Sequence, residues 1–140
     1  GVKRALQRRL NVPLEPQTSD YGEAFECWFV NECQRLNQYL ECDYAFSYLR
    51  TKDDMEIDLI VDRPGQKLAL VEVKSAASID ERHIRGLLAF HDDFPGADLI
   101  CAAKVNEARK IGPVLILPWR QALERLFQLP AVDASPADTP

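Results

Sequence analysis

Long hydrophobic segments are missing from this sequence, as are the motifs of several common functional classes. No apolar run approaches the roughly 20 residues that a membrane-spanning helix needs, so we expect no membrane span. No segment matches G-x-x-x-x-G-K-[ST], so these 140 residues contain no P-loop phosphate site. The four cysteines have neither Cys-x-x-Cys nor zinc-like spacing, and we interpret them as free thiols in a reducing cytoplasm.

An excess of positive charge is also missing. The 17 lysines and arginines are outnumbered by 22 aspartates and glutamates, which gives a formal net charge of −5. Because non-specific nucleic-acid binding depends on neutralising phosphates, this balance opposes such binding without excluding a local basic surface. The hydrophobic fraction of 46% is ample for a core, and the length predicts a single domain.

Two apolar segments joined by a turn are the most informative part of the chain. Residues 55–62 read MEIDLIVD and residues 67–74 read KLALVEVK, with the turn signal RPGQ between them. Strict alternation along a strand places Ile57 and Leu59 on one face and Asp58 on the other. We expect the hairpin to bring Asp58 close to Glu72, with Lys74 beside them.

The acidic residues of this hairpin have two interpretations. Ionised carboxylates in a sheet core are costly unless they are paired, hydrogen-bonded or bound to metal. Mg²⁺ usually takes one or two protein carboxylates, which makes Asp58 and Glu72 candidate ligands and Lys74 a candidate for orienting water or offsetting negative charge. The alternative is a surface hairpin whose lysine pairs with a carboxylate across the strands.

Hydrophobic periodicity predicts the other elements of a mixed α/β sheet flanked by helices. On the first long helix, Phe25 and Phe29 belong to an apolar stripe, and Glu26 lies one step around from it, where a solvated residue is the alternative interpretation. A capping-box pattern at Ser78 is expected to open a later helix. The expected elements, in chain order, are a short basic helix at 3–10, a helix at 21–40, a strand at 44–50, the hairpin, a helix at 78–91, strands at 98–103 and 114–117, and a helix at 118–127.

These segments together resemble the PD-(D/E)XK nuclease superfamily, in which a helical glutamate, a strand aspartate and a Glu-x-Lys cluster bind Mg²⁺ and cleave phosphodiesters. More narrowly, the chain resembles the nuclease-like C-terminal domain that follows an AAA-type ATPase module in many bacterial and archaeal proteins. The matching segments, in order, are GVKRAL at 1–6, GEAFE at 22–26, RT at 50–51, EID at 56–58 and EVKS at 72–75. Leu49 and Ala76 depart from the family, which often has an aromatic residue and a serine or threonine there.

The resemblance implies an α/β fold with an αβββαβ restriction-endonuclease-like core. It also implies a nuclease-like domain at residues 1–130, as the C-terminal part of a longer ATPase-containing protein, followed by a disordered tail at residues 131–140. The implied partners are nucleic acid, expected to be DNA, and the AAA-type ATPase module. A homo-oligomer is left open.

The resemblance further implies roles for individual residues. Asp58, Glu72 and the Val73 carbonyl would ligate Mg²⁺ or Mn²⁺, Lys74 would position or activate water, and Glu26 would lie across the site. The pair Arg50 and Thr51 would shape the entrance for nucleic acid.

Three functions remain open from the sequence. The first is a metal-dependent DNA endonuclease. The second is a catalytically inactive nuclease-fold module that binds nucleic acid or a protein partner and regulates the ATPase. The third is a regulatory or dimerising domain that uses Trp28 or Trp119.

Overall fold

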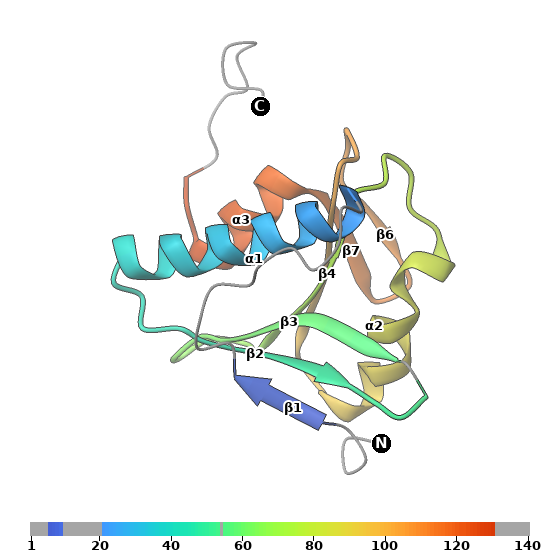
Figure 1. Cartoon of the computed structure of the whole chain (residues 1–140), viewed down its shortest axis with the longest axis horizontal. Helices are drawn as coiled ribbons and strands as arrows, with labels where there is room; N and C mark the ends of the chain where they lie inside the picture. Colours follow the sequence, from blue (N-terminus) through green and yellow to red (C-terminus); the bar gives the residue numbers. More distant parts are fainter. Residues whose placement is uncertain (1–5, 10–20, 54, 131–140) are drawn as a thin grey trace.

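The protein has an α/β architecture, in which one mixed sheet lies between helices (Figure 1). The computed structural model describes residues 6–9, 21–53 and 55–130. The strands of the sheet are β1 (Leu6–Arg9), β2 (Ala45–Arg50), β3 (Glu56–Asp62), β4 (Ala69–Lys74), β5 (Asp98–Ala103), β6 (Arg109–Ile111) and β7 (Val114–Pro118). The helices are α1 (Tyr21–Tyr39), α2 (Arg85–Phe90) and α3 (Trp119–Phe127), with short 3-10 turns η2 (Glu81–Ile84) and η3 (His91–Asp93) on either side of α2.

The sheet combines an antiparallel meander with a parallel half. Its strand order is β1-β2-β3-β4-β5-β7-β6. The first four strands pair antiparallel in sequence, whereas β4, β5 and β7 run parallel and β6 closes the edge antiparallel to β7. The segment containing α2 crosses from β4 to β5, as a parallel connection requires. The predicted mixed sheet flanked by helices is therefore confirmed.

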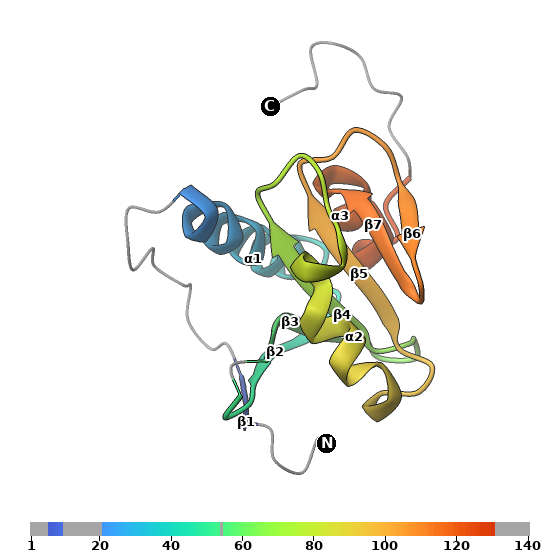
Figure 2. The same ribbon diagram turned by 90° about the vertical axis from the view of Figure 1, so that its right-hand side faces the viewer.

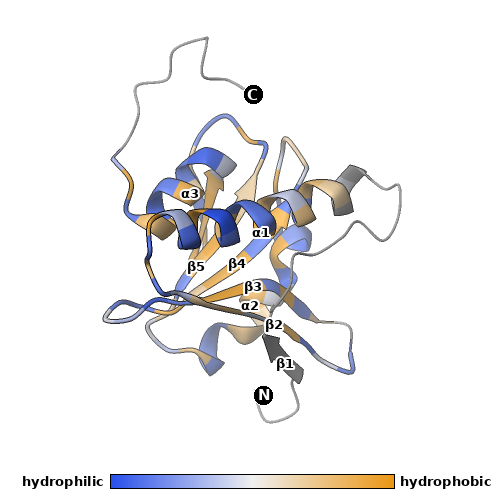
Figure 3. Cartoon of the chain, turned by 60° about the vertical axis from the view of Figure 1, so that its left-hand side comes forward, coloured by the Kyte–Doolittle hydropathy of each residue, from blue (hydrophilic) through white to orange (hydrophobic). Residues whose placement is uncertain are grey.

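Helices cover both faces of the sheet, so the molecule has two apolar cores. Helices α1 and α3 pack on one face, and α2 packs on the other (Figures 1 and 2). Along β4, Val71 and Val73 enter the core beneath α1, whereas Leu70 enters the core beneath α2. Colouring by hydropathy shows the apolar sheet between the more polar helices (Figure 3). The continuous apolar strands are thus explained by burial on both faces.

The alternation predicted for the first strand of the hairpin is wrong, because β3 contains a bulge. Leu59 lies in the core beneath α1, whereas Ile57 lies in the core beneath α2. The register pairs Ser47 with Ile60 and Leu49 with Ile57, which leaves two β3 residues opposite one β2 residue. The extra residue reverses the alternation at Asp58–Leu59.

The short helix predicted at residues 3–10 is also wrong over the part that the structure describes. Residues 6–9 form β1, which pairs antiparallel with β2 from Leu6 opposite Arg50 to Arg9 opposite Ser47. Backbone hydrogen bonding to an otherwise open sheet edge decides the conformation of this short basic segment. The remaining residues of that prediction and the tail at 131–140 lie outside the described residues.

The helix predicted at 78–91 is shorter and begins later. Asp80, not Ser78, is the N-cap: its Oδ1 accepts a hydrogen bond from the Arg82 amide at 2.9 Å. The Asp80 amide in turn donates to Nδ1 of His83 at 3.0 Å, which completes a reciprocal capping box with a histidine in the usual glutamate position. His83 therefore has a structural role.

Of the helices in the described ranges, none is long and apolar enough to cross a membrane.

Candidate active site

Three elements bring the predicted site residues together. Glu26 comes from the N-terminal half of α1, Asp58 from the bulge of β3, and Glu72 and Lys74 from the carboxyl end of β4. The side chains of both glutamates are hydrogen-bonded to Asp58. The structure therefore answers one question that the sequence left open, because Glu26 reaches the other carboxylates.

Asp58 is fixed where β3 and β4 part. The two strands pair from Val61 opposite Ala69 to Leu59 opposite Val71, and this pairing ends before Asp58. Oδ2 of Asp58 instead accepts a hydrogen bond from the Val73 amide at 2.8 Å. The carboxylate thus takes the place of a strand partner and is held against β4.

Burial and mutual repulsion raise the pKa values of all three acids. Burial is the largest cause of the raised pKa of Glu72, which is only 3% exposed, and the charge of Asp58 adds to it. Burial likewise raises the pKa of Glu26, again reinforced by Asp58. Burial also raises the pKa of Asp58, but the hydrogen bonds from Val73 and Glu26 oppose the shift. In the absence of a cation, all three carboxyl groups therefore hold their protons more tightly than exposed acids do.

Lys74 supplies the positive charge of the cluster. Its Nζ lies 3.7 Å from Oε2 of Glu72, and its side chain is 36% exposed, so the ammonium lies at the mouth of the site. Partial burial acts to lower the pKa of Lys74, but the charges of Glu72 and Asp58 outweigh it and raise that pKa. Lys74 is therefore a fixed cation and not a free base.

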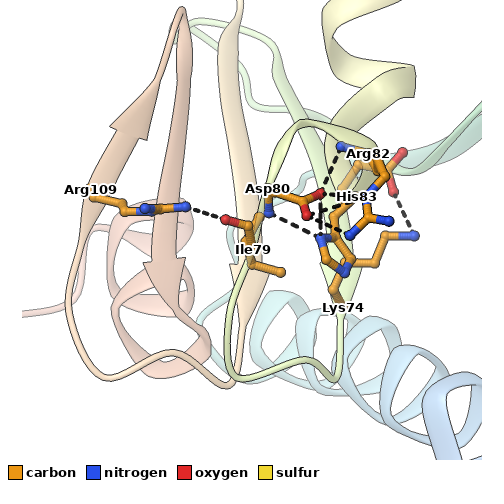
Figure 4. Close-up of polar contacts among 7 residues, drawn as sticks. Lys74, Ile79, Asp80, Arg82, His83 and Arg109 are labelled. Carbon is orange, nitrogen blue, oxygen red and sulfur yellow. Dashed lines mark hydrogen bonds and ion pairs between the residues drawn. The ribbon is translucent and has the colours of Figure 1, made fainter.

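The segment after β4 is anchored by its own polar contacts, which Figure 4 shows together with Lys74. The Asp80–His83 capping box holds the turn that leads into α2. The guanidinium of Arg109, from β6, donates to the Ile79 carbonyl. These contacts connect the chain that leaves the site to the far edge of the sheet.

Gly86 is a site residue that the sequence analysis missed. A Cβ atom built on Gly86 would lie 2.0 Å from the Glu56 carbonyl oxygen and 2.9 Å from Oε1 of Glu72. Only a residue without a side chain lets α2 approach β3 and the Glu72 carboxylate this closely. A glycine inside a helical pattern, where it is unfavourable, is the signal that could have identified it.

Cys101 forms part of the buried surroundings of Glu72. It is the partner of Glu72 in the parallel register of β4 and β5 and is completely buried. Burial, followed by the charge of Glu72, raises the pKa of its thiol to about 12. Cys101 is therefore a buried thiol outside any disulfide, in agreement with the interpretation of the cysteines as free thiols.

Arg50 is the last residue of β2, and Thr51 begins the turn that leads to β3. The Arg50 guanidinium donates to Oε2 of Glu56 at 3.0 Å, in an exposed ion pair. The Thr51 amide donates to the Met55 carbonyl at 2.8 Å, and the Thr51 hydroxyl accepts from the Met55 amide at 3.2 Å. Thr51 therefore closes the turn, while Arg50 balances a glutamate whose charge contributes to the raised pKa values in the cluster.

The donor set fits a hard divalent cation held by few protein ligands. Asp58 and Glu72 offer carboxylate oxygens next to one another, and Val73 is bound to Asp58 through its amide. In the described part of the chain, no three His, Cys, Asp or Glu side chains already surround a common point as a metal site would. Mg²⁺ commonly needs only one or two carboxylates and completes its shell with water.

Comparison with known proteins gives a family for most of the chain. Residues 21–121 match a family model described as "Domain of unknown function (DUF4143)". The matched range contains all four members of the acidic and lysine cluster. No curated protein matches the chain.

Proposed function

The chain belongs to the DUF4143 family, and we propose that it is a metal-dependent nuclease-like domain that acts on nucleic-acid phosphodiester bonds. One observation carries the proposal: Glu26, Asp58, Glu72 and Lys74, from three separate elements, converge in one cluster. This is the residue set of the PD-(D/E)XK resemblance, brought together by the fold.

The electrostatics of the cluster favour a cation site over a structural salt bridge. A stable ion pair needs one carboxylate for one lysine, whereas here three carboxyl groups share Lys74 and all have raised pKa values. Such an arrangement is costly in the absence of a cation. Groups with strongly perturbed pKa values are characteristic of functional sites.

In the proposed site, Asp58, Glu72 and the Val73 carbonyl would hold Mg²⁺ or Mn²⁺. When bound, such an ion polarises a phosphate and lowers the pKa of coordinated water. Lys74, at the mouth of the site, would bind a phosphate oxygen and offset the charge that develops on it. Glu26 would accept a hydrogen bond from water on the α1 side.

The proposed setting is an AAA-type ATPase module in the same full-length protein, with DNA as the expected substrate. This part of the proposal rests on the sequence segments that resemble the nuclease-like domains of such proteins. The end of β2, with Arg50, and the turn that follows it would lie toward the entering nucleic acid.

The experiment is cleavage of supercoiled plasmid DNA in Mg²⁺ or Mn²⁺, combined with a calorimetric Mn²⁺ titration. Asp58→Asn should abolish both cleavage and Mn²⁺ binding, because it removes the central charge but preserves the shape of the side chain. Lys74→Ala should abolish cleavage but retain Mn²⁺ binding. The matched control is Asp62→Asn, which neutralises an exposed carboxylate on the same strand. Cleavage that survives both site variants would refute the nuclease proposal.

A second candidate is a catalytically inactive nuclease-fold module that binds nucleic acid or a partner and regulates the ATPase. The net charge of −5 favours this candidate over a nuclease, because a nuclease must bind a polyanion and an excess of negative charge opposes such binding. Metal-independent oligonucleotide binding by the wild type, with no cleavage under any metal condition, would favour this module over the enzyme.

A further inference from the structure

The carboxyl ends of three parallel strands meet at the edge that carries the acidic cluster. The register places Lys74 of β4 beside Ala103 of β5, and Ala103 beside Pro118 of β7. The residues that follow these strand ends therefore emerge together, among them Lys104 after β5 and Trp119 at the start of α3. Ligands of open α/β sheets bind outside the carboxyl ends of the strands.

At this edge, aromatic rings and cations form a continuous chain of contacts between α1, β5 and α3, which we call the aromatic–cationic strip. Nζ of Lys104 lies 5.0 Å from the centre of the Phe25 ring, and that ring is stacked on Trp28 with centroids 6.0 Å apart. Trp28 meets Trp119 edge to face at 5.2 Å, and the Arg120 guanidinium lies 5.3 Å from the Trp119 ring. Cations therefore stand at both ends of a row of three rings.

The strip begins beside the candidate site, and its middle ring, Trp28, is exposed. Phe25 precedes Glu26, whose carboxyl is bound to Asp58, so one helix connects the strip to the acidic cluster. Helices α1 and α3 lie on the same face of the sheet (Figure 3), and the ring contacts of the strip join Phe25 and Trp28 of α1 to Trp119 of α3. Trp28 is 43% exposed, which is unusual for so large an apolar side chain.

We propose that the aromatic–cationic strip binds a single-stranded segment of nucleic acid and leads it toward the acidic cluster. Unpaired bases stack on exposed aromatic rings regardless of sequence, and the spaced cations bind the connecting phosphates. Trp28 supplies the exposed ring, and Lys104 and Arg120 supply the cations. Because the chain as a whole is acidic, binding must rely on such a local surface. The inference rests on the proposed function for its substrate class, and names the part of the substrate that is held.

The test is fluorescence anisotropy with a fluorescein-labelled oligo(dT) 20-mer in EDTA, where metal-dependent cleavage cannot occur. We expect Trp28→Leu, which keeps an apolar side chain but removes the ring, to weaken binding at least about fivefold, the lower range for loss of one base stack. Lys104→Gln and Arg120→Gln should each reduce the slope of log K against log salt by about 0.7. The variant Trp119→Phe leaves Trp28 as the single tryptophan, and its fluorescence should be quenched by the oligonucleotide.

Matched controls lie at a distance from the strip. Tyr39 is a 78% exposed aromatic residue at the other end of α1, and Lys67 is an exposed cation in the turn between β3 and β4. Tyr39→Leu and Lys67→Gln should leave oligonucleotide binding unchanged. The proposal would be overturned if Trp28→Leu, and a variant that combines Lys104→Gln with Arg120→Gln, both bound the oligonucleotide with wild-type affinity. So would concentration-dependent dimerisation of the wild type that Trp28→Leu abolishes, because a second copy would then cover the ring.

The two proposals fail separately. Strip-dependent binding without metal-dependent cleavage would support the strip and refute the nuclease. Cleavage that requires Asp58 but is indifferent to Trp28 would support the nuclease and overturn the strip.

Discussion

Replacing Gly86 by alanine tests whether close packing of α2 shapes the candidate site. The added Cβ would lie 2.0 Å from the Glu56 carbonyl oxygen, whereas real Cβ contacts are essentially never below 3.0 Å. Helix α2 must therefore retreat by about 1 Å, since the obstructing atom is backbone and cannot rotate away.

Two opposing effects set the size of the change. Overpacking against backbone costs about 3 kcal/mol, the upper end of the usual range. Alanine in place of glycine inside a helix returns about 1 kcal/mol. We therefore expect Gly86→Ala to lower the free energy of unfolding by about 2 kcal/mol, measured by urea denaturation. The shift of α2 also disturbs the packing of Glu72, so Mn²⁺ affinity should fall about tenfold.

The matched control is Ala89→Gly, on the exposed side of the same helix. It changes helix propensity without changing the packing against β3, and should cost about 1 kcal/mol. A Gly86→Ala protein that is as stable as the wild type and binds Mn²⁺ equally well would refute the packing argument.

Three further predictions follow from individual contacts. In EDTA the free energy of unfolding should fall as pH rises above about 4.5, because native Glu72, with its raised pKa, retains a proton that the unfolded chain releases. Glu72→Gln should make this slope shallower in urea titrations at several pH values, with the remainder due to Glu26 and Asp58, whose pKa values are also raised. An equal slope in both proteins would contradict the prediction. Phe29 is completely buried on the sheet-facing side of α1, so Phe29→Ala should lower the free energy of unfolding by about 3–5 kcal/mol in urea denaturation. Tyr39→Ala, on the exposed side of the helix, should change it by less than about 0.5 kcal/mol. Similar losses in the two variants would argue against the packing of α1. The ion pair between Arg125 and Asp98 is 2.7 Å long, but the arginine side chain is half-exposed. Arg125→Ala should therefore lower the free energy of unfolding by less than about 1 kcal/mol in low salt. A larger loss would mean that the apolar part of the arginine side chain contributes by packing.

The sequence predicted those parts of the fold in which one strong signal decides the structure. Helix α1 has a long apolar stripe and was predicted almost to its boundaries. Strands β5 and β7 are continuous apolar runs, which burial on both faces explains. The hairpin turn was predicted from Pro64 and Gly65, and Gly65 has the positive φ of +75° that such a turn favours.

Weak local signals gave the errors. The segment at residues 6–9 is short and basic, and its strand conformation depends on the open edge of β2, which no local pattern reveals. Strand β6 has only three residues and was missed for the same reason. The chain around Asp80 carries two overlapping capping patterns, and the one that uses His83 prevails because its imidazole accepts from the N-cap amide.

The candidate site illustrates why the residues of a site are easier to predict than its geometry. Strict alternation predicted Asp58 and Glu72 on one face, which would leave Glu26, on α1, behind the opposite face of the sheet. The bulge removes this conflict, because it changes the side of the sheet to which β3 residues point at Asp58. The pairing of β3 with β4 begins only at the next residue, Leu59, so Asp58 has no partner in β4. Acids from helix and sheet can then meet at one carboxylate, which the Val73 amide holds in the gap. A one-residue insertion in a strand does not change the hydrophobic composition of the segment, so the sequence does not reveal the bulge. The sequence therefore indicated which side chains meet, but not that the two strands must separate for them to do so.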